Sequence, residues 1–122
     1  MADFKPAAVL IVEDEWLIAK VLKETLEGAG FEVRGPAPRV SDALDLIAEN
    51  GLDAAILDVS LRGESSFPVA RALAKRSIPF AFMTGYVNAD FLEEFKNRPI
   101  LSKPFEEGKL VSCVRGLLGA RL

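Results

Sequence analysis

The sequence predicts an α/β fold in which helices cover both faces of a five-stranded parallel sheet. Two observations favour this fold. Short apolar segments rich in Val, Ile, Leu and Phe recur along the chain, and longer stretches with helical spacing separate them. Near-continuous apolar strands are typical of a sheet buried on both faces. The predicted strands are residues 8–12, 31–35, 54–57, 80–83 and 100–102.

Five helices are predicted from apolar spacing and from the residues that begin and end helices. Residues 15–28 place their apolar side chains on one face, and the Gly-Ala-Gly at 28–30 follows as a stop. Residues 41–50 begin with Ser41 as a possible N-cap and end at Asn50-Gly51. The same spacing predicts further helices at 67–76 and 106–121, and a shorter one at 88–96.

Composition limits the function classes. The 122 residues are enough for one domain, residues 1–122, and half of them are apolar. A net charge of −3 without a basic block argues against a nucleic-acid partner. The single cysteine, Cys113, excludes an internal disulfide, and the N-terminal apolar run is too short for a signal peptide or membrane span. We therefore expect a cytoplasmic protein that does not contact a membrane.

The chain contains no histidine. This excludes a Ser-His-Asp or Cys-His nucleophile system and a histidine-ligated zinc site built from this chain alone. It also excludes a phosphohistidine carrier. Any chemistry must come from carboxylates, hydroxyls, lysines and backbone groups.

Right-handed crossovers favour the flavodoxin-like, doubly wound strand order 2-1-3-4-5. In that order ligands bind outside the carboxyl ends of the strands, at the switch point between strands 1 and 3. Strand 1 is followed by Glu13 and Asp14, strand 3 by Asp58, strand 4 by Thr84 and strand 5 by Lys103. We expect these side chains to meet at one crevice.

Each of these residues alone is an ordinary strand-end, capping or loop residue. Together they form a chemically complementary set. Clustered carboxylates repel one another unless a cation neutralises them, and Mg²⁺ or Mn²⁺ with oxygen ligands suits an open crevice. A carboxylate nucleophile beside a metal ion, a lysine and a hydroxyl can form an aspartyl phosphate.

The sequence strongly resembles the receiver domains of bacterial two-component response regulators. The resemblance covers nearly the whole chain and rests on "LIVEDE" (10–15), "AILDVSLRGE" (55–64), "FMTGY" (82–86) and "LSKPF" (101–105). It implies that Asp58 is the phosphoacceptor and that Glu13, Asp14, Asp58 and the main-chain carbonyl of Ser60 hold the metal. It also implies that Thr84 is the switch hydroxyl, that Lys103 binds the phosphoryl group, and that the bond before Pro104 is cis.

The chain departs from the family pattern where activation is coupled to output. Ile100 stands at the position of the usual aromatic switch residue. The chain is similar to a receiver subset with a Thr-Gly-Tyr turn, and Tyr86 could take over this role, together with Pro104 and Phe105. By the same resemblance, bulky Tyr86 should hinder attacking water, so we expect Tyr86→Ala to shorten the lifetime of the phosphoryl group.

The sequence therefore predicts a phosphorylation-operated switch rather than a metabolic enzyme. By the resemblance, its phosphoryl donor is a sensor histidine kinase or a histidine phosphotransfer protein. Output would be by protein contact, with an unknown partner or in a homodimer, through the face formed by residues 88–96, 100–102 and 106–121. A stand-alone receiver and one cut from a longer protein both remain open. The alternatives are a phosphorylation-independent docking module and, ranked last, a metal-dependent phosphohydrolase.

Overall fold

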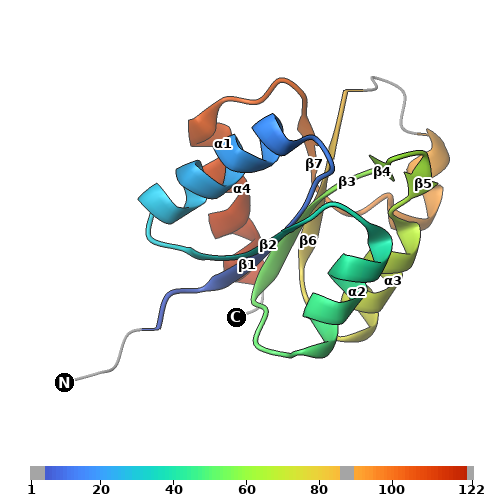
Figure 1. The fold of residues 1–122 in the computed structure, drawn as a ribbon, viewed down its shortest axis with the longest axis horizontal. Helices are drawn as coiled ribbons and strands as arrows, with labels where there is room; N and C mark the ends of the chain where they lie inside the picture. Colours follow the sequence, from blue (N-terminus) through green and yellow to red (C-terminus); the bar gives the residue numbers. More distant parts are fainter. Residues whose placement is uncertain (1–4, 86–89, 121–122) are drawn as a thin grey trace.

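The structure is a computed structural model that describes residues 5–85 and 90–120. A five-stranded parallel sheet forms the middle layer, in the order β2-β1-β3-β6-β7 (Figure 1). Numbered among the five strands alone, this is the predicted order 2-1-3-4-5, which is therefore confirmed. The strands are β1 (Ala8–Val12), β2 (Glu32–Ala37), β3 (Ala54–Asp58), β6 (Phe80–Thr84) and β7 (Ile100–Ser102).

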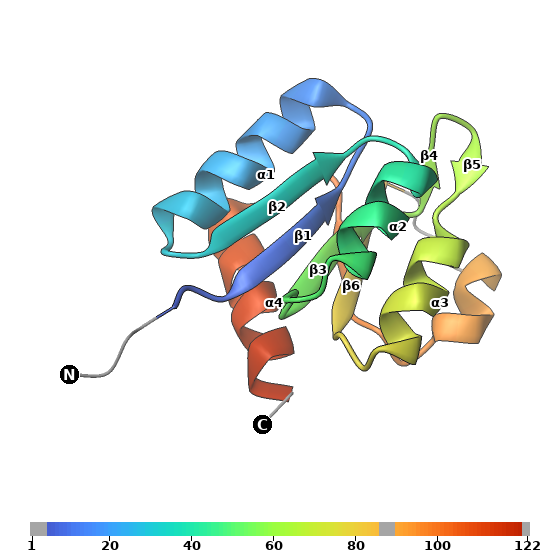
Figure 2. The ribbon, with the colours of Figure 1, turned by 60° about the horizontal axis from the view of Figure 1, so that its bottom comes forward.

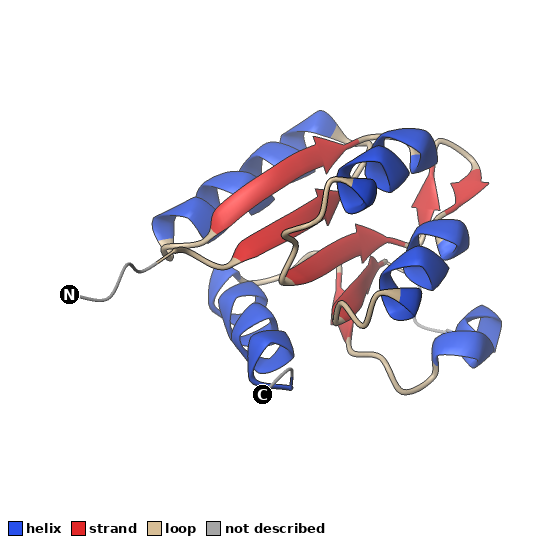
Figure 3. Cartoon of the chain, turned by 90° about the horizontal axis from the view of Figure 1, so that it is seen from below, coloured by secondary structure: helices blue, strands red, loops and turns tan. Residues whose placement is uncertain are grey.

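Helices cover both faces of the sheet. The helices α1 (Trp16–Gly28) and α4 (Glu107–Ala120) lie on one face, and α2 (Val40–Ala48) and α3 (Phe67–Lys75) lie on the other (Figures 2 and 3). No helix within the described ranges is long and apolar enough to cross a membrane.

Side-chain alternation along the strands builds two cores. In β1, Val9 and Ile11 belong to the core under α1 and α4, whereas Leu10 and Val12 belong to the core under α2 and α3. Residues two apart on a strand point to the same face, so each strand supplies both cores. All five residues of β1 are buried, and this explains its continuous apolar run.

The fourth predicted helix has a different form. Residues Asp90–Phe95 are a 3-10 helix, η1, so the five helices of the described part of the chain are four α-helices and one 3-10 helix. A short segment gains little from helical hydrogen bonding alone. Pro99 limits its extension, and Phe95 fixes its end in the core under α2 and α3.

The helix α2 begins one residue earlier than predicted. It starts at Val40, and Arg39 rather than Ser41 occupies the N-cap position with an extended backbone. Val40 is buried against the core, and this contact draws it into the first turn. The predicted stop is confirmed, because Asn50 adopts a left-handed φ of 68° two residues after the helix ends.

A small hairpin between β3 and α3 is absent from the sequence prediction. Its strands are β4 (Ser60–Leu61) and β5 (Glu64–Ser65), which pair antiparallel. Arg62 and Gly63 connect them with φ values of 50° and 83°. Two positive φ angles at the centre of a two-residue loop are characteristic of a type I′ turn.

Candidate functional site

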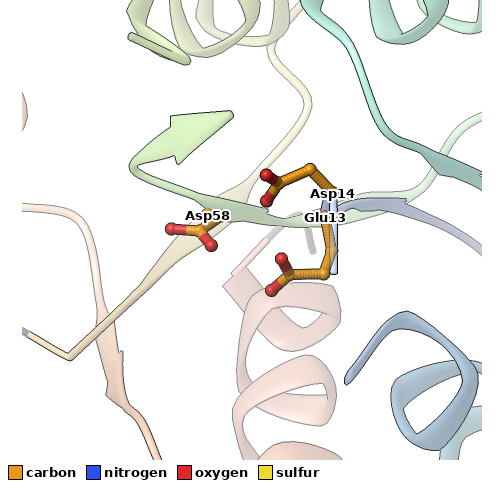
Figure 4. A group of neighbouring side chains, drawn as sticks. All are labelled: Glu13, Asp14 and Asp58. Atoms are coloured by element: carbon orange, nitrogen blue, oxygen red, sulfur yellow. The ribbon is translucent and has the colours of Figure 1, made fainter. Parts of the chain in front are cut away.

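Three carboxylates converge at the carboxyl ends of the two central strands. Val12 and Leu57 are partners in the β1–β3 ladder, so Glu13 and Asp58 follow at neighbouring strand ends. Figure 4 shows Glu13, Asp14 and Asp58 directed toward a common space. One carboxylate oxygen of each lies within 4.8 Å of those of the other two. The predicted convergence is present.

Lys103 connects two of these carboxylates. Its Nζ donates to Glu13 Oε1 at 2.7 Å and to Asp58 Oδ2 at 2.6 Å. Burial lowers the pKa of Lys103, but the hydrogen bonds to Asp58 and Glu13 outweigh it, and the pKa is raised above its ordinary value. The ammonium group is therefore charged at neutral pH.

Glu13 is the buried member of the cluster, and its side chain has no exposed surface. The backbone N–H of Glu15 donates to Glu13 Oε2 at 3.1 Å, while Lys103 occupies Oε1. Burial raises the pKa of Glu13 most strongly, and the lysine opposes this rise. Glu13 thus binds Lys103 on the buried side of the cluster, whereas Asp14 and Asp58 line the open pocket.

The β4–β5 hairpin supplies backbone groups to the other two carboxylates. The N–H of Arg62 donates to Asp14 Oδ2 at 3.1 Å, and the N–H of Ser60 donates to Asp58 Oδ1 at 3.3 Å. The ladder bond runs from Ser66 N–H to the Val59 carbonyl, so Ser60 belongs to a non-hydrogen-bonded pair. Its N–H and carbonyl therefore point away from β5, on the side of Asp58.

Thr84 closes the pocket from the end of β6. It is buried, and its carbonyl accepts a hydrogen bond from the Lys103 N–H at 2.9 Å, which ties the ends of β6 and β7 together. The pocket has a volume of about 390 Å³. Its lining residues are Asp14, Glu15, Asp58, Val59, Ser60, Arg62, Gly63, Thr84, Gly85 and Lys103.

Of the residues considered for coupling, Ile100, Pro104 and Phe105 lie among the described residues. The Lys103–Pro104 bond is cis, as the resemblance implied. Phe105 is partly buried against the core under α1 and α4, and Ile100 is 47% exposed on β7. Tyr86 lies outside the described residues.

The donor set fits a hard divalent cation. Three carboxylates against one ammonium leave two negative charges at the cluster, and all side-chain donors there are oxygens. Mg²⁺ takes one or two carboxylates together with water and phosphate oxygens. An open pocket with Asp14 and Asp58 on its wall is compatible with that preference.

Sequence reasoning missed the backbone contacts of Glu15 and Arg62. Glu15 follows the acidic pair directly, so its contact is local. Arg62 contacts Asp14 because the hairpin folds back toward the end of β1. In the sequence, Gly63 is the one signal for this turn, because Arg62 is of a residue type that rarely adopts positive φ.

Comparison with known proteins agrees with this geometry. A family model described as the response regulator receiver domain matches residues 9–115. The transcriptional regulatory protein PdtaR of Mycobacterium tuberculosis is 30% identical over 113 residues, which cover 89% of this chain and 55% of PdtaR. The sensory transduction protein LytT of Bacillus anthracis is 34% identical over 112 residues, which cover 88% of this chain and 45% of LytT. This chain thus spans about half the length of the curated relatives it matches.

Among solved structures, the solution structure of SdrG from Sphingomonas melonis Fr1 is 45% identical with a TM-score of 0.82, and the match covers 93% of this chain and 97% of SdrG. A structure of SdrG in its BeF3-activated conformation is 44% identical with a TM-score of 0.78, covering 91% and 95% of the two chains. The family match, the strand order and the acidic pocket lead to one conclusion: this chain belongs to the receiver domains of response regulators, the phosphorylation-operated signalling switches of two-component systems.

Proposed function

We propose that Asp58 accepts a phosphoryl group from a phosphohistidine of a sensor kinase or a histidine phosphotransfer protein. The observation that carries this proposal is the position of Asp58. Its carboxylate lies in the open pocket, 2.6 Å from the Lys103 ammonium and beside Asp14. Because the chain has no histidine, the phosphohistidine has to come from a partner.

In the transfer, a carboxylate oxygen of Asp58 attacks phosphorus as the bond from phosphorus to the donor nitrogen breaks. The electron pair of that bond stays with the imidazole. A metal ion held by Asp14, Asp58 and the Ser60 carbonyl, with Glu13 acting through water, would neutralise the phosphoryl oxygens when bound. Lys103 and Thr84 donate hydrogen bonds to those oxygens.

Phosphorylation changes what Lys103 binds. Before transfer, its ammonium bonds Asp58 Oδ2; afterwards the phosphoryl oxygens compete for it, while buried Glu13 keeps the lysine in place. The link from the Lys103 N–H to the Thr84 carbonyl carries this change to the ends of β6 and β7. The switch is therefore a population shift that favours one arrangement of the loops after β3 and β6.

Output by protein contact, through an unknown partner or a homodimer on the η1–β7–α4 face, belongs to the same proposal. We also propose that the only reactions this protein catalyses are its own phosphorylation and dephosphorylation. Coupling through Tyr86, Pro104 and Phe105 and a location in the cytoplasm stay predictions of the sequence.

The test is incubation with acetyl phosphate or phosphoramidate and Mg²⁺, followed by intact-mass measurement, with Asp58→Asn as the control. We expect one acid-stable, base-labile phosphate on the wild type and none on the variant. If neither these donors nor any histidine kinase produces an adduct, the domain is a phosphorylation-independent docking module. Turnover of unrelated phosphate esters would show a phosphohydrolase instead.

A further inference from the structure

We infer that Arg62 recognises the phosphoryl donor, with its guanidinium receiving the anionic phosphoryl group at the mouth of the pocket before transfer to Asp58. This inference rests on the proposed function, and it gives a role to a residue outside the acidic pair, the acceptor, the switch hydroxyl and the lysine. Arg62 makes and breaks no covalent bond in this role.

The backbone of Arg62 is the first observation. Three described residues other than glycine have positive φ: Asn50, Arg62 and Ser77. Asn50 and Ser77 directly follow the C-caps of α2 and α3, where the left-handed conformation commonly ends a helix. Arg62 instead occupies a hairpin tip beside the site, and residues held in unfavourable conformations concentrate at functional sites.

That conformation fixes Arg62 against the acidic cluster. Its N–H bonds Asp14 across 48 positions of sequence, at 3.1 Å. The oxygen that Asp14 offers as a ligand lies within 4.8 Å of the one that Asp58 offers. The Arg62 backbone is therefore bonded directly to Asp14, the carboxylate next to the proposed phosphoacceptor Asp58.

Arg62 also lies where two pockets adjoin. It lines the Asp58 pocket and a second pocket of about 410 Å³, which contains Trp16, Lys20 and Lys23 and shares Asp14 with the first. A donor that enters the Asp58 pocket from the side of α1 therefore passes Arg62.

The positive charge of the Arg62 side chain is not neutralised by any other described residue. Its side chain is exposed, and none of the ion pairs among the described residues involves it. Arg71 and Arg34, by contrast, are paired with Glu94 and Glu32. A phosphoryl dianion that approaches the carboxylates is repelled, and a free cation at the entrance offsets this repulsion and raises the rate of productive encounter.

The experiment compares two small donors of different charge: acetyl phosphate, a dianion, and phosphoramidate, a monoanion at neutral pH. The Arg62→Gln variant keeps the backbone N–H but removes the charge. We expect the phosphorylation rate with acetyl phosphate at low salt to fall by about three- to fivefold, the scale of an exposed ion pair. The loss should be smaller with phosphoramidate and should disappear at high salt, and Arg62→Lys should restore most of the rate.

Binding of Mg²⁺, followed by Trp16 fluorescence, separates recognition from support of the fold. If Arg62 acts through its charge, Arg62→Gln binds Mg²⁺ as tightly as the wild type or more tightly, because one cation near the carboxylates is gone. The matched control Lys109→Gln removes the same charge from an exposed position on α4. It should leave the phosphorylation rates with acetyl phosphate and with phosphoramidate unchanged.

Three results would overturn the inference. They are an unchanged rate in Arg62→Gln, an equal and salt-independent loss with both donors, or a loss of Mg²⁺ affinity in step with the rate, which would make Arg62 only a support for Asp14. If the wild type forms no adduct with either donor or with any histidine kinase, the proposed function itself has failed. If it forms one that Asp58→Asn abolishes while Arg62→Gln matches the wild type, only this inference has failed.

Discussion

Glu13 and Lys103 are the residues on which the geometry of the pocket depends most directly. The carboxylate of Glu13 is fully buried, and Lys103 supplies its charge partner at 2.7 Å. Removing one member of a buried pair leaves the other uncompensated, which costs more than the pair contributes.

We predict that Lys103→Met lowers the free energy of unfolding by roughly 1–3 kcal/mol, because Glu13 loses its charged donor and keeps only the N–H of Glu15. Adding Glu13→Gln should recover much of this loss, since a neutral amide needs no opposite charge. Urea denaturation of the two single variants and the double variant measures the coupling. Simply additive effects would show that the two side chains are energetically independent.

The positions of single residues differ in how well the sequence predicts them. Asp58, Thr84 and Lys103 were placed together because the carboxyl ends of parallel strands share one edge, and topology alone brings them there. The contact of Arg62 with Asp14 was not predictable, because it depends on a turn in which arginine adopts an unfavourable φ of 50°. Local sequence preference at position 62 argues against that turn, whereas Gly63 favours it, and the bond from the Arg62 N–H to Asp14 holds the tip of the hairpin in place.

At the scale of elements, the 3-10 helix η1 occupies the position of the fourth helix, between β6 and β7. The spacing at 88–96 predicts a short helix, and the structure has a 3-10 helix within that range. Among the described side chains of η1, Phe95 packs against the aromatic rings of the core, and Glu94 binds Arg71 on α3. Such long-range contacts carry no periodic signal in the sequence.

The contact of η1 with α3 is pH-dependent. Arg71 makes a two-pronged hydrogen bond to Glu94, at 2.9 and 2.8 Å, which holds the pKa of Glu94 below its ordinary value of 4.5. An acid with a lowered pKa adds stability above its ordinary pKa and loses it as the pH falls through the lowered one. Arg71→Gln should therefore be less stable than the wild type at pH 7, and the two should converge below about pH 4.5.

The measurement for this pair is the unfolding midpoint of both proteins across the acid range. Arg115→Gln removes an exposed arginine from α4 and serves as the control, with a difference from the wild type that stays constant over the same range. A constant difference for Arg71→Gln as well would show that the ion pair contributes nothing to stability.

Phe95 is the apolar anchor of η1. Its ring lies 5.4, 5.9 and 5.5 Å from those of Phe67, Phe80 and Phe82. Phe95→Ala should cost about 3–5 kcal/mol, the usual cost of deleting a buried ring, and Phe95→Leu clearly less. Hydrogen exchange should become faster in residues 93–98 and in α3, and unchanged exchange there would contradict an anchoring role.

At the scale of the whole molecule, the carboxylates of the acidic cluster that suit a metal ion also lower the stability of the metal-free protein. Three carboxylates within 4.8 Å repel one another, and only one lysine bonds to them within the described part of the chain. A cation that binds the folded state alone stabilises it by mass action, by about 2.7 kcal/mol at one hundred times its dissociation constant.

We therefore predict that Mg²⁺ raises the thermal unfolding midpoint, and that Asp14→Asn is more stable than the wild type without Mg²⁺ but responds less to it. A monovalent salt at the same ionic strength controls for screening. An Asp14→Asn protein that gains as much from Mg²⁺ as the wild type would remove Asp14 from the metal site.

The fold as a whole was the most predictable feature, since the five apolar strands and their order follow from hydrophobic patterning and the handedness of crossovers. The proposed function depends on Asp58, at the carboxyl edge of that sheet. The most direct test is to phosphorylate the protein with acetyl phosphate and Mg²⁺, reduce it with borohydride, and map the product by peptide mass spectrometry. If Asp58 is the phosphoacceptor, homoserine forms at position 58 and at no other position. Homoserine at another carboxylate, or none at position 58 in a phosphorylated protein, would contradict it.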